Sequence, residues 1–204
     1  MADRLKKLLV ATNNPGKLAE LRSLLDGLPV ELRSLEDVEQ IVQIEETGAT
    51  FIENARLKAS GYAMQTGLPA IADDSGLEVD ALGGRPGVLS ARYGGPDTGF
   101  DEKMAKLLGE LDEIGHARRT ARFVCAIAVA DSSGNILCTA EGICSGNIAA
   151  APRGLHGFGY DPLFIPDGYD QTFGELSGAI KGKISHRSSA FEQIIPFLRD
   201  FIAV

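Results

Sequence analysis

The sequence predicts an α/β fold around a mixed β-sheet. Short apolar runs alternate with segments whose apolar residues recur at helical spacing, which is typical of strands interleaved with helices. Two strand-like segments, 122–130 and 136–144, are separated by five turn-forming residues, Asp131 to Asn135, which predicts a hairpin. A chain of 204 residues, 44% of them hydrophobic, can bury a sizeable core. We therefore expect residues 1–204 to form a single domain.

The first elements are a strand and a helix. The apolar run Leu8 to Ala11 predicts a short buried strand. A loop follows, and then a helix with Asn14 as its N-cap and Pro15 as its first residue, because proline has the φ angle of a helix and needs no hydrogen bond there. The leucines of this helix share one face: Leu18, Leu21, Leu24 and Leu25.

Further signals place the next helix and two strands. Residues 50–53 have the spacing of a capping box, so we expect a helix from there to Thr66, with Gly67 ending it. Residues 69–72 predict a short buried strand that runs into an Asp-Asp-Ser-Gly segment. Residues 77–82 predict another strand.

The second half follows the same pattern. A Gly/Pro-rich loop is expected at 83–95, a helix at 100–111 and a second loop-rich stretch at 154–167. Ser189 to Glu192 has the spacing of a second capping box, which predicts the start of a last helix. Pro196 is expected to kink that helix or to delay its start.

Composition excludes several classes of protein. The formal net charge of -8 argues against a large basic surface for DNA or RNA polymers. No apolar run approaches the roughly 20 residues of a membrane helix, and the N-terminus has no signal-peptide core. Cys125, Cys138 and Cys144 form no CxxC pair, so reduced thiols are expected. Together these features predict a cytoplasmic protein that binds no membrane.

The loop after the first strand is a candidate phosphate site. A strand that feeds a helix directs free backbone N–H groups and the positive end of the helix dipole to one place, and a lysine adds a full charge. It is not a Walker A loop, because the earlier glycine and the following Ser or Thr are absent. The pattern also fits an ordinary capped loop. The residues concerned are Thr12, Asn13, Asn14, Pro15, Gly16 and Lys17.

Two acidic pairs are candidate metal ligands. Asp73 and Asp74 directly follow an apolar strand, where carboxylates are costly to bury unless they are paired or bind a metal. Oxygen ligands of this kind suit Mg²⁺, which takes one or two carboxylates and keeps waters and phosphate oxygens. A solvated turn is the alternative. The pair Glu45-Glu46 gains interest as a source of a second ligand only because of Asp73 and Asp74.

Two later segments are candidates for binding a flat polar ligand. Residues 154–161 place aromatic residues between glycines, so that Phe158 can either stack on a base or join the local core. Residues 181–187 concentrate hydrogen-bond donors: Lys181 and Arg187 can donate to carbonyl oxygens, and His186 can donate or accept. A solvated basic face is the alternative for this segment.

Taken in order, these segments resemble the inosine triphosphate pyrophosphatase family, whose bacterial members are dITP/XTP pyrophosphatases. The resemblance runs from residue 8 to about residue 190, and the ordered set is far more specific than any single motif. The matching segments are residues 12–17, 45–48, 51–55, 72–77, 86–87, 90–93, 158–161 and 185–187.

The resemblance implies a two-lobed fold with a long mixed sheet, flanking helices, a nucleotide cleft between the lobes and a homodimer. It implies that residues 12–17 hold the triphosphate, that Glu45 and Asp74 bind Mg²⁺, and that Asp74 accepts the proton of the attacking water. Asp73 would support the same metal centre and Ser75 would touch the substrate. Phe158, Gly159, Tyr160 and Asp161 would line the base and sugar. Lys181, His186 and Arg187 would read the edge of the purine.

The activity implied is hydrolysis of dITP, ITP and XTP to the monophosphate and pyrophosphate. Two alternatives stay open from the sequence: a pyrophosphatase with another base preference, and a nucleotide sensor without catalysis. A kinase-like phosphotransferase is disfavoured because the Walker A pattern is absent.

Overall fold

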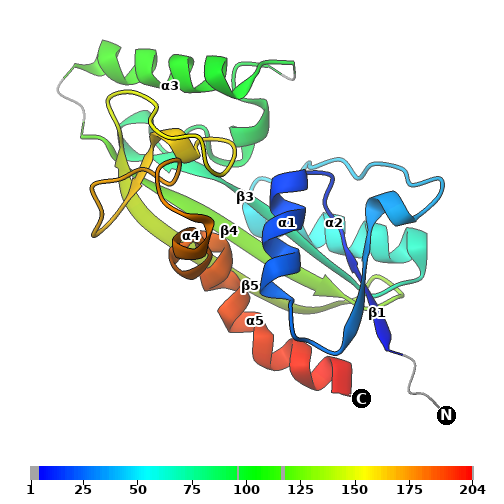
Figure 1. The fold of residues 1–204 in the computed structure, drawn as a ribbon. Helices are drawn as coiled ribbons and strands as arrows, with labels where there is room; N and C mark the ends of the chain where they lie inside the picture. Colours follow the sequence, from blue (N-terminus) through cyan, green and yellow to red (C-terminus); the bar gives the residue numbers. More distant parts are fainter. Residues whose placement is uncertain (1–4, 96, 116–117, 204) are drawn as a thin grey trace. The chain divides into compact units, whose positions relative to one another are not determined.

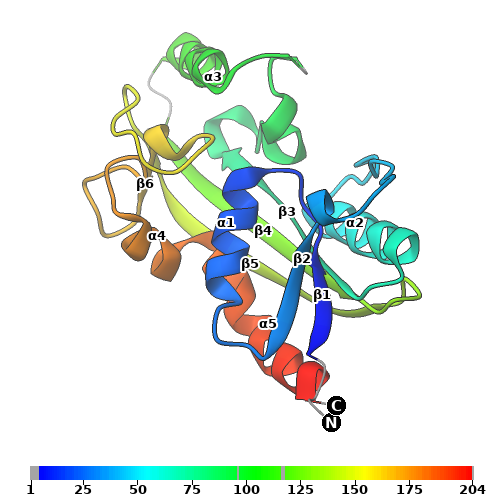
Figure 2. The ribbon, with the colours of Figure 1, turned by 45° about the vertical axis from the view of Figure 1, so that its right-hand side comes forward.

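The structure is a computed structural model that describes residues 5–95, 97–115 and 118–203. Helices and strands are interspersed along the chain (Figures 1 and 2). The strands are β1 (Lys6–Val10), β2 (Val30–Ser34), β3 (Ala70–Val79), β4 (Thr120–Ala130), β5 (Ile136–Ile148) and β6 (Phe164–Pro166). The α-helices are α1 (Pro15–Leu24), α2 (Phe51–Thr66), α3 (Phe100–Ile114), α4 (Gly178–Ile184) and α5 (His186–Ala203). In the three described ranges, no helix combines the length and the apolar character that crossing a membrane requires.

The strands form one mixed sheet in the order β2-β1-β3-β4-β5-β6. β1 pairs in parallel with both β2 and β3, whereas β5 pairs antiparallel with β6. The predicted hairpin turn lies between β4 and β5, where the side chain of Asp131 accepts hydrogen bonds from the backbone N–H groups of Ser133 and Asn135. The predicted α/β fold with a mixed sheet is therefore confirmed.

The chain divides into two compact units. The first contains residues up to Asp74, residues 125–142 and residues from Ala190 onward, and the second contains residues 75–124 and 143–189. Each unit has its own hydrophobic core, because each cluster of buried apolar side chains is drawn from one unit alone.

The core of the first unit lies between its strands and two helices. Leu21 and Leu25 from the α1 segment and Ile194 and Leu198 from α5 pack with apolar residues of β1, β3 and β4 such as Ile127. Figures 1 and 2 show α2 on the opposite side of β1 from α1. α2 begins and ends as predicted: Thr50 and Glu53 form the capping box, and Gly67 has the left-handed conformation that ends the helix.

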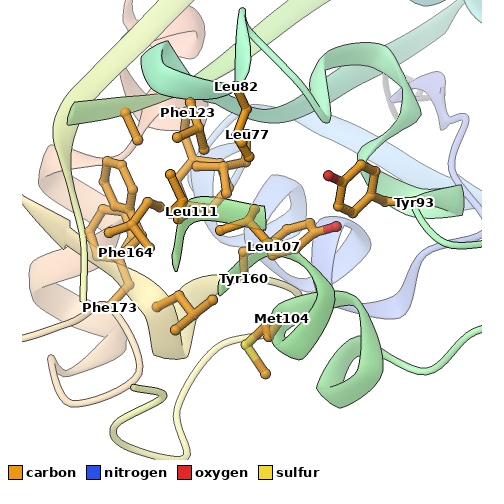
Figure 3. Close-up of a cluster of buried hydrophobic side chains, with 14 of the residues drawn as sticks. Leu77, Leu82, Tyr93, Met104, Leu107, Leu111, Phe123, Tyr160, Phe164 and Phe173 are labelled. Carbon is orange, nitrogen blue, oxygen red and sulfur yellow. The ribbon is translucent and has the colours of Figure 1, made fainter. Parts of the chain in front are cut away.

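The core of the second unit is rich in aromatic side chains. Met104, Leu107 and Leu111 of α3 point into this cluster, where Figure 3 shows them with Tyr93 and Tyr160 and with aromatic residues of β4 and β6. The three α3 residues recur at helical spacing, so a single face of the helix is buried. This cluster supports the loop that carries residues 158–161.

The largest correction to the sequence reading concerns β3. Residues 69–72 and 77–82 were expected to form separate strands, with an Asp-Asp-Ser-Gly segment between them as a candidate turn. The structure instead has one strand from Ala70 to Val79, and only residues 80–82 leave it as a short 3-10 helix. The strand continues because the buried carboxylates have partners among basic and amide side chains, so that burial does not require a turn into solvent.

The start of the last helix was also predicted wrongly. α5 begins at His186 rather than after Ser189, and Ser189 lies inside it. The hydroxyl of Ser185 accepts a hydrogen bond from the N–H of Ser188, so the capping side chain lies four residues before Ser189, where it was expected. The helix runs through Pro196 without a delayed start. The strand β6 was missed because its three residues are too few to show a period.

Candidate active site

The phosphate-loop candidate has the predicted cap geometry. The side chain of Asn14 accepts a hydrogen bond from the N–H of Lys17 at 3.1 Å, and Thr12 accepts one from the N–H of Asn14 at 3.2 Å. Pro15 is the first helical residue. These contacts hold the loop at the N-terminus of α1, where the helix dipole favours an anion.

Lys17 links this loop to β3. Its ammonium group lies 3.3 Å from Oδ2 of Asp73, which is completely buried. The thiol of Cys125 also approaches that carboxylate, at 3.8 Å. Lys17 thus stands at the loop as predicted, with its charge compensated by a residue from a segment that the sequence places 56 positions later.

Asp74 has a different set of partners, because neighbouring residues of a strand project to opposite faces. Its Oδ1 lies 3.2 Å from Nζ of Lys58, and its Oδ2 accepts a hydrogen bond from Nδ2 of Asn54 at 3.1 Å. Both partners come from α2 and are one helical turn apart. Side chains of a single helix therefore bind both oxygens of the carboxylate.

Burial sets the protonation behaviour of this group. Loss of solvent raises the pKa of Asp74 above its ordinary value, and the charges of Lys58 and Lys17 and the hydrogen bond from Asn54 oppose that rise only in part. Burial lowers the pKa of Lys58, but the carboxylates of Asp74, Asp73 and Glu46 outweigh it, so that its net pKa is raised. A carboxylate of raised pKa is a stronger base than an ordinary aspartate, which suits a proton acceptor.

The two glutamates before α2, Glu45 and Glu46, lie in different environments. Oε1 of Glu46 lies 2.6 Å from Nζ of Lys58, so Glu46 shares that lysine with Asp74. The side chain of Glu45, the residue predicted as a metal ligand, is exposed. No site role was predicted for Lys58 or for Asn54, although Asn54 lies in the matching segment 51–55. Their signal was two polar residues four positions apart on a helix face otherwise made of alanines and aromatics.

The donor set fits a magnesium ion in its chemistry. Among the residues that the structure describes, no three His, Cys, Asp or Glu side chains gather closely enough to hold an ion by themselves. Mg²⁺ needs no such cage, because it usually takes one or two carboxylates and completes its coordination with waters and substrate phosphates. Asp74 with one glutamate of the pair 45–46 would meet that requirement.

The second unit gathers the predicted base-binding residues around Asp161. Its Oδ2 lies 2.5 Å from Nζ of Lys181 and accepts a hydrogen bond from the N–H of Phe158 at 2.8 Å. Gly157 has a φ of 74°, and a Cβ there would stand 1.9 Å from the same oxygen, so the turn requires glycine. Asp161 therefore fixes both the loop and the lysine.

Two cations approach the ring of Phe158. Nζ of Lys181 is 4.6 Å from the ring centroid and Cζ of Arg187 is 5.9 Å from it. Arg187 is 1% exposed and donates a hydrogen bond to Oγ of Ser75 at 2.9 Å. Both cations are buried, so the alternative of a solvated basic face is wrong for them.

The remaining predicted residues of this unit make contacts with its hydrophobic core and backbone. The imidazole of His186 stacks on Phe123 with a centroid distance of 4.7 Å. Tyr160 is buried in the hydrophobic cluster and donates a hydrogen bond to the backbone oxygen of Ser90. Gly159 adopts a φ of 66° beside it. That Tyr160 lines the sugar or base stays a prediction.

Comparison with known proteins places this geometry in a family. The model of the Ham1 family matches residues 8–197. The chain belongs to the Ham1 family. Among its relatives, the dITP/XTP pyrophosphatase of Synechocystis sp. is 49% identical, covering 92% of this chain and 93% of the relative. The dITP/XTP pyrophosphatase of Geobacter sulfurreducens is 50% identical, covering 90% and 92%.

Solved structures of Ham1 proteins share the fold. The HAM1 protein from Coxiella burnetii superposes with a TM-score of 0.88 at 40% identity, covering 96% of this chain and all of that one. A nucleoside-triphosphatase described as a dITP/XTP pyrophosphatase from Mycobacterium abscessus gives a TM-score of 0.73 at 47% identity, with coverages of 93% and 99%. Membership of the Ham1 family agrees with the resemblance found in the sequence.

Proposed function

We propose that this Ham1 protein hydrolyses dITP, ITP and XTP to the nucleoside monophosphate and pyrophosphate. The observation that carries the chemistry is the buried carboxylate of Asp74, whose pKa is raised and whose two oxygens are fixed by Lys58 and Asn54. Relatives that share about half of their residues with this chain are dITP/XTP pyrophosphatases, which supports the same reaction here.

In this proposal the first unit handles the triphosphate. The N–H groups at the start of α1 and the ammonium of Lys17 bind phosphate oxygens and stabilise the leaving pyrophosphate. Asp74 accepts a proton from the attacking water. Mg²⁺, held by Asp74 and Glu45, would supply charge neutralisation at the phosphate oxygens and a lower pKa for nearby water. Asp73 holds Lys17 in place and supports this centre.

The second unit supplies selectivity for the base. Hypoxanthine and xanthine carry an oxygen at the purine 6-position, where adenine carries an amino group. Donors from Arg187 and Lys181, with His186, would pair with that oxygen and would face another donor in adenine. Each unpaired buried group costs about 1–3 kcal/mol, so two mismatches give roughly 10²- to 10⁴-fold discrimination against ATP. Ser75 and residues 158–161 would complete the contacts to the nucleotide.

We further propose that the protein acts in the cytoplasm as a homodimer and that its ligand is a single nucleotide rather than a nucleic-acid polymer. The net charge of -8 supports the last point. Sedimentation of the purified chain would test the dimer, and a monomer across the micromolar range would reject it.

The direct test is pyrophosphate release with Mg²⁺ from a panel of ITP, dITP, XTP, dUTP, GTP and ATP. We expect ITP, dITP and XTP to be cleaved at least about 100-fold more efficiently than ATP. Equal efficiency on ATP and ITP would reject the base selectivity. Tight ITP binding without pyrophosphate release would instead identify a nucleotide sensor.

A further inference from the structure

Asn54 occupies an unusual place in the first unit. Its side chain is completely buried, although it belongs to the first turns of α2 beside an exposed loop. A buried amide needs partners for both its oxygen and its nitrogen. Asn54 finds one partner in the loop before the helix and the other in β3.

The two hydrogen bonds run to opposite ends of the proposed acidic site. Oδ1 of Asn54 accepts a hydrogen bond from the N–H of Gly48 at 2.7 Å, and Nδ2 donates one to Oδ2 of Asp74 at 3.1 Å. One planar amide thus spans from the segment that carries Glu45 and Glu46 to the carboxylate of Asp74. Rotation of the amide would break both bonds at once.

The space beside the amide leaves no room for a side chain at Gly48. A Cβ added to Gly48 would stand 2.7 Å from Oδ1 of Asn54 and 3.0 Å from its backbone nitrogen. The loop therefore approaches the amide more closely than any residue with a side chain could. Neighbouring contacts also hold the loop against α2, because the carboxylate of Glu53 accepts hydrogen bonds from the N–H groups of Ala49 and Thr50.

We infer that Asn54 is a positioning residue that sets the orientation of the Asp74 carboxylate relative to residues 45–48. The inference rests on the proposed role of Asp74 in hydrolysis. Lys58 binds the other oxygen of Asp74, so one charge and one amide define the plane of the carboxylate. Groups that orient an acidic ligand or base in this way change activity about 10- to 100-fold when they are replaced.

Two substitutions separate the two hydrogen bonds of Asn54, one with Gly48 and one with Asp74. Asn54→Asp keeps an oxygen to accept from Gly48 but presents a second acceptor to Asp74, whereas Asn54→Ala removes both contacts. Amide hydrogen exchange of Gly48 reports its hydrogen bond to position 54, and kcat for ITP reports the contact with Asp74. In Asn54→Asp the side chain has no amide N–H for Asp74, so we expect preserved Gly48 protection and a kcat lower by about 10- to 100-fold. KM should change by less than about threefold, since the phosphate and base contacts of the proposal do not include Asn54.

Two further variants test whether a lower kcat is specific to the hydrogen bonds of Asn54. Gln65→Ala removes another side-chain amide of α2, which bonds the backbone of Val42 far along the same helix, and should leave kcat and KM unchanged. Gly48→Ala displaces the amide from the loop side and should lower kcat in the same direction even if Asn54 variants fold poorly. Rates are referred to the folded fraction measured by circular dichroism.

The outcomes distinguish this inference from the proposed function. Absence of pyrophosphate release from the wild-type chain would reject the proposed function itself. With an active wild type, a kcat within about twofold of wild type in both Asn54→Asp and Gly48→Ala would overturn the positioning role. A rise in KM equal to the fall in kcat/KM would also overturn it, because that pattern indicates lost substrate binding.

Discussion

Lys17 and Asp73 form an ion pair at 3.3 Å, in which the carboxylate is completely buried and the lysine side chain is 13% exposed. The pair joins the loop at the start of α1 to the middle of β3. Lys17 supplies a counter-charge to the buried carboxylate of Asp73, and the pair holds a cation at the place where the phosphates are proposed to bind.

Removal of the lysine charge should therefore destabilise the fold as well as weaken binding. Lys17→Met leaves the Asp73 carboxylate buried without this counter-charge, which we expect to cost about 3 kcal/mol in the free energy of unfolding. Urea unfolding measures it. The double variant Lys17→Met/Asp73→Asn should recover part of the loss, and a double variant less stable than Lys17→Met would contradict the pairing.

Asp74→Asn tests the proton acceptor. The amide cannot take a proton from water, so we expect kcat for ITP to fall by about 10²- to 10⁴-fold at saturating Mg²⁺. The fold should persist, because burial already disfavours the charged form of Asp74. The control is Asp26→Asn, at an exposed residue, and this variant should hydrolyse ITP at the wild-type rate. Near-normal turnover in Asp74→Asn would remove Asp74 from the mechanism.

Asp161→Asn tests the base-side ion pair. It leaves Lys181 buried without its counter-charge and weakens the bond to the N–H of Phe158. We expect KM for ITP to rise about tenfold or more, with a smaller change in kcat because the phosphates use other residues. Steady-state kinetics measures both constants. Glu175→Gln, which weakens a half-exposed pair with Arg153, is the matched control. Unchanged KM in Asp161→Asn would count against the proposed base contacts.

Tyr93 should make the fold sensitive to alkaline pH. Burial and a hydrogen bond to Glu110 at 2.7 Å raise the pKa of Tyr93 to about 12. An unfolded tyrosine titrates near 10, so the unfolded chain releases this proton first and stability is lost as pH rises from about 10 to about 12.

The comparison uses urea midpoints of wild type and Tyr93→Phe between about pH 9 and about pH 11. The variant loses the hydrogen bond to Glu110, but its midpoint should fall less steeply with pH. Tyr169→Phe, at a tyrosine 40% exposed, should follow the wild-type slope. Parallel curves for wild type and Tyr93→Phe would show that Tyr93 does not titrate as stated.

Local signals in the sequence were enough for most of the elements. The N-cap Asn14 and the capping box at Thr50 act within one helical turn, so their effect is complete in the local sequence. β3 was misjudged for the opposite reason. Asp73 and Asp74 look like a turn until Lys17, Lys58 and Asn54 are placed beside them, and those partners lie 16 to 56 residues away.

The sequence by itself determined the α/β architecture, the start of α1, the bounds of α2 and the set of segments that identify the family, because capping, hydrophobic period and motif order are properties of neighbouring residues. The tertiary structure decided the partners of each charge: which lysine faces Asp73 or Asp74, that Lys181 and Arg187 are buried around Phe158, and that Asn54 spans Gly48 and Asp74. Burial and hydrogen bonding between distant segments have no local pattern, since they depend on which strand and helix meet in space.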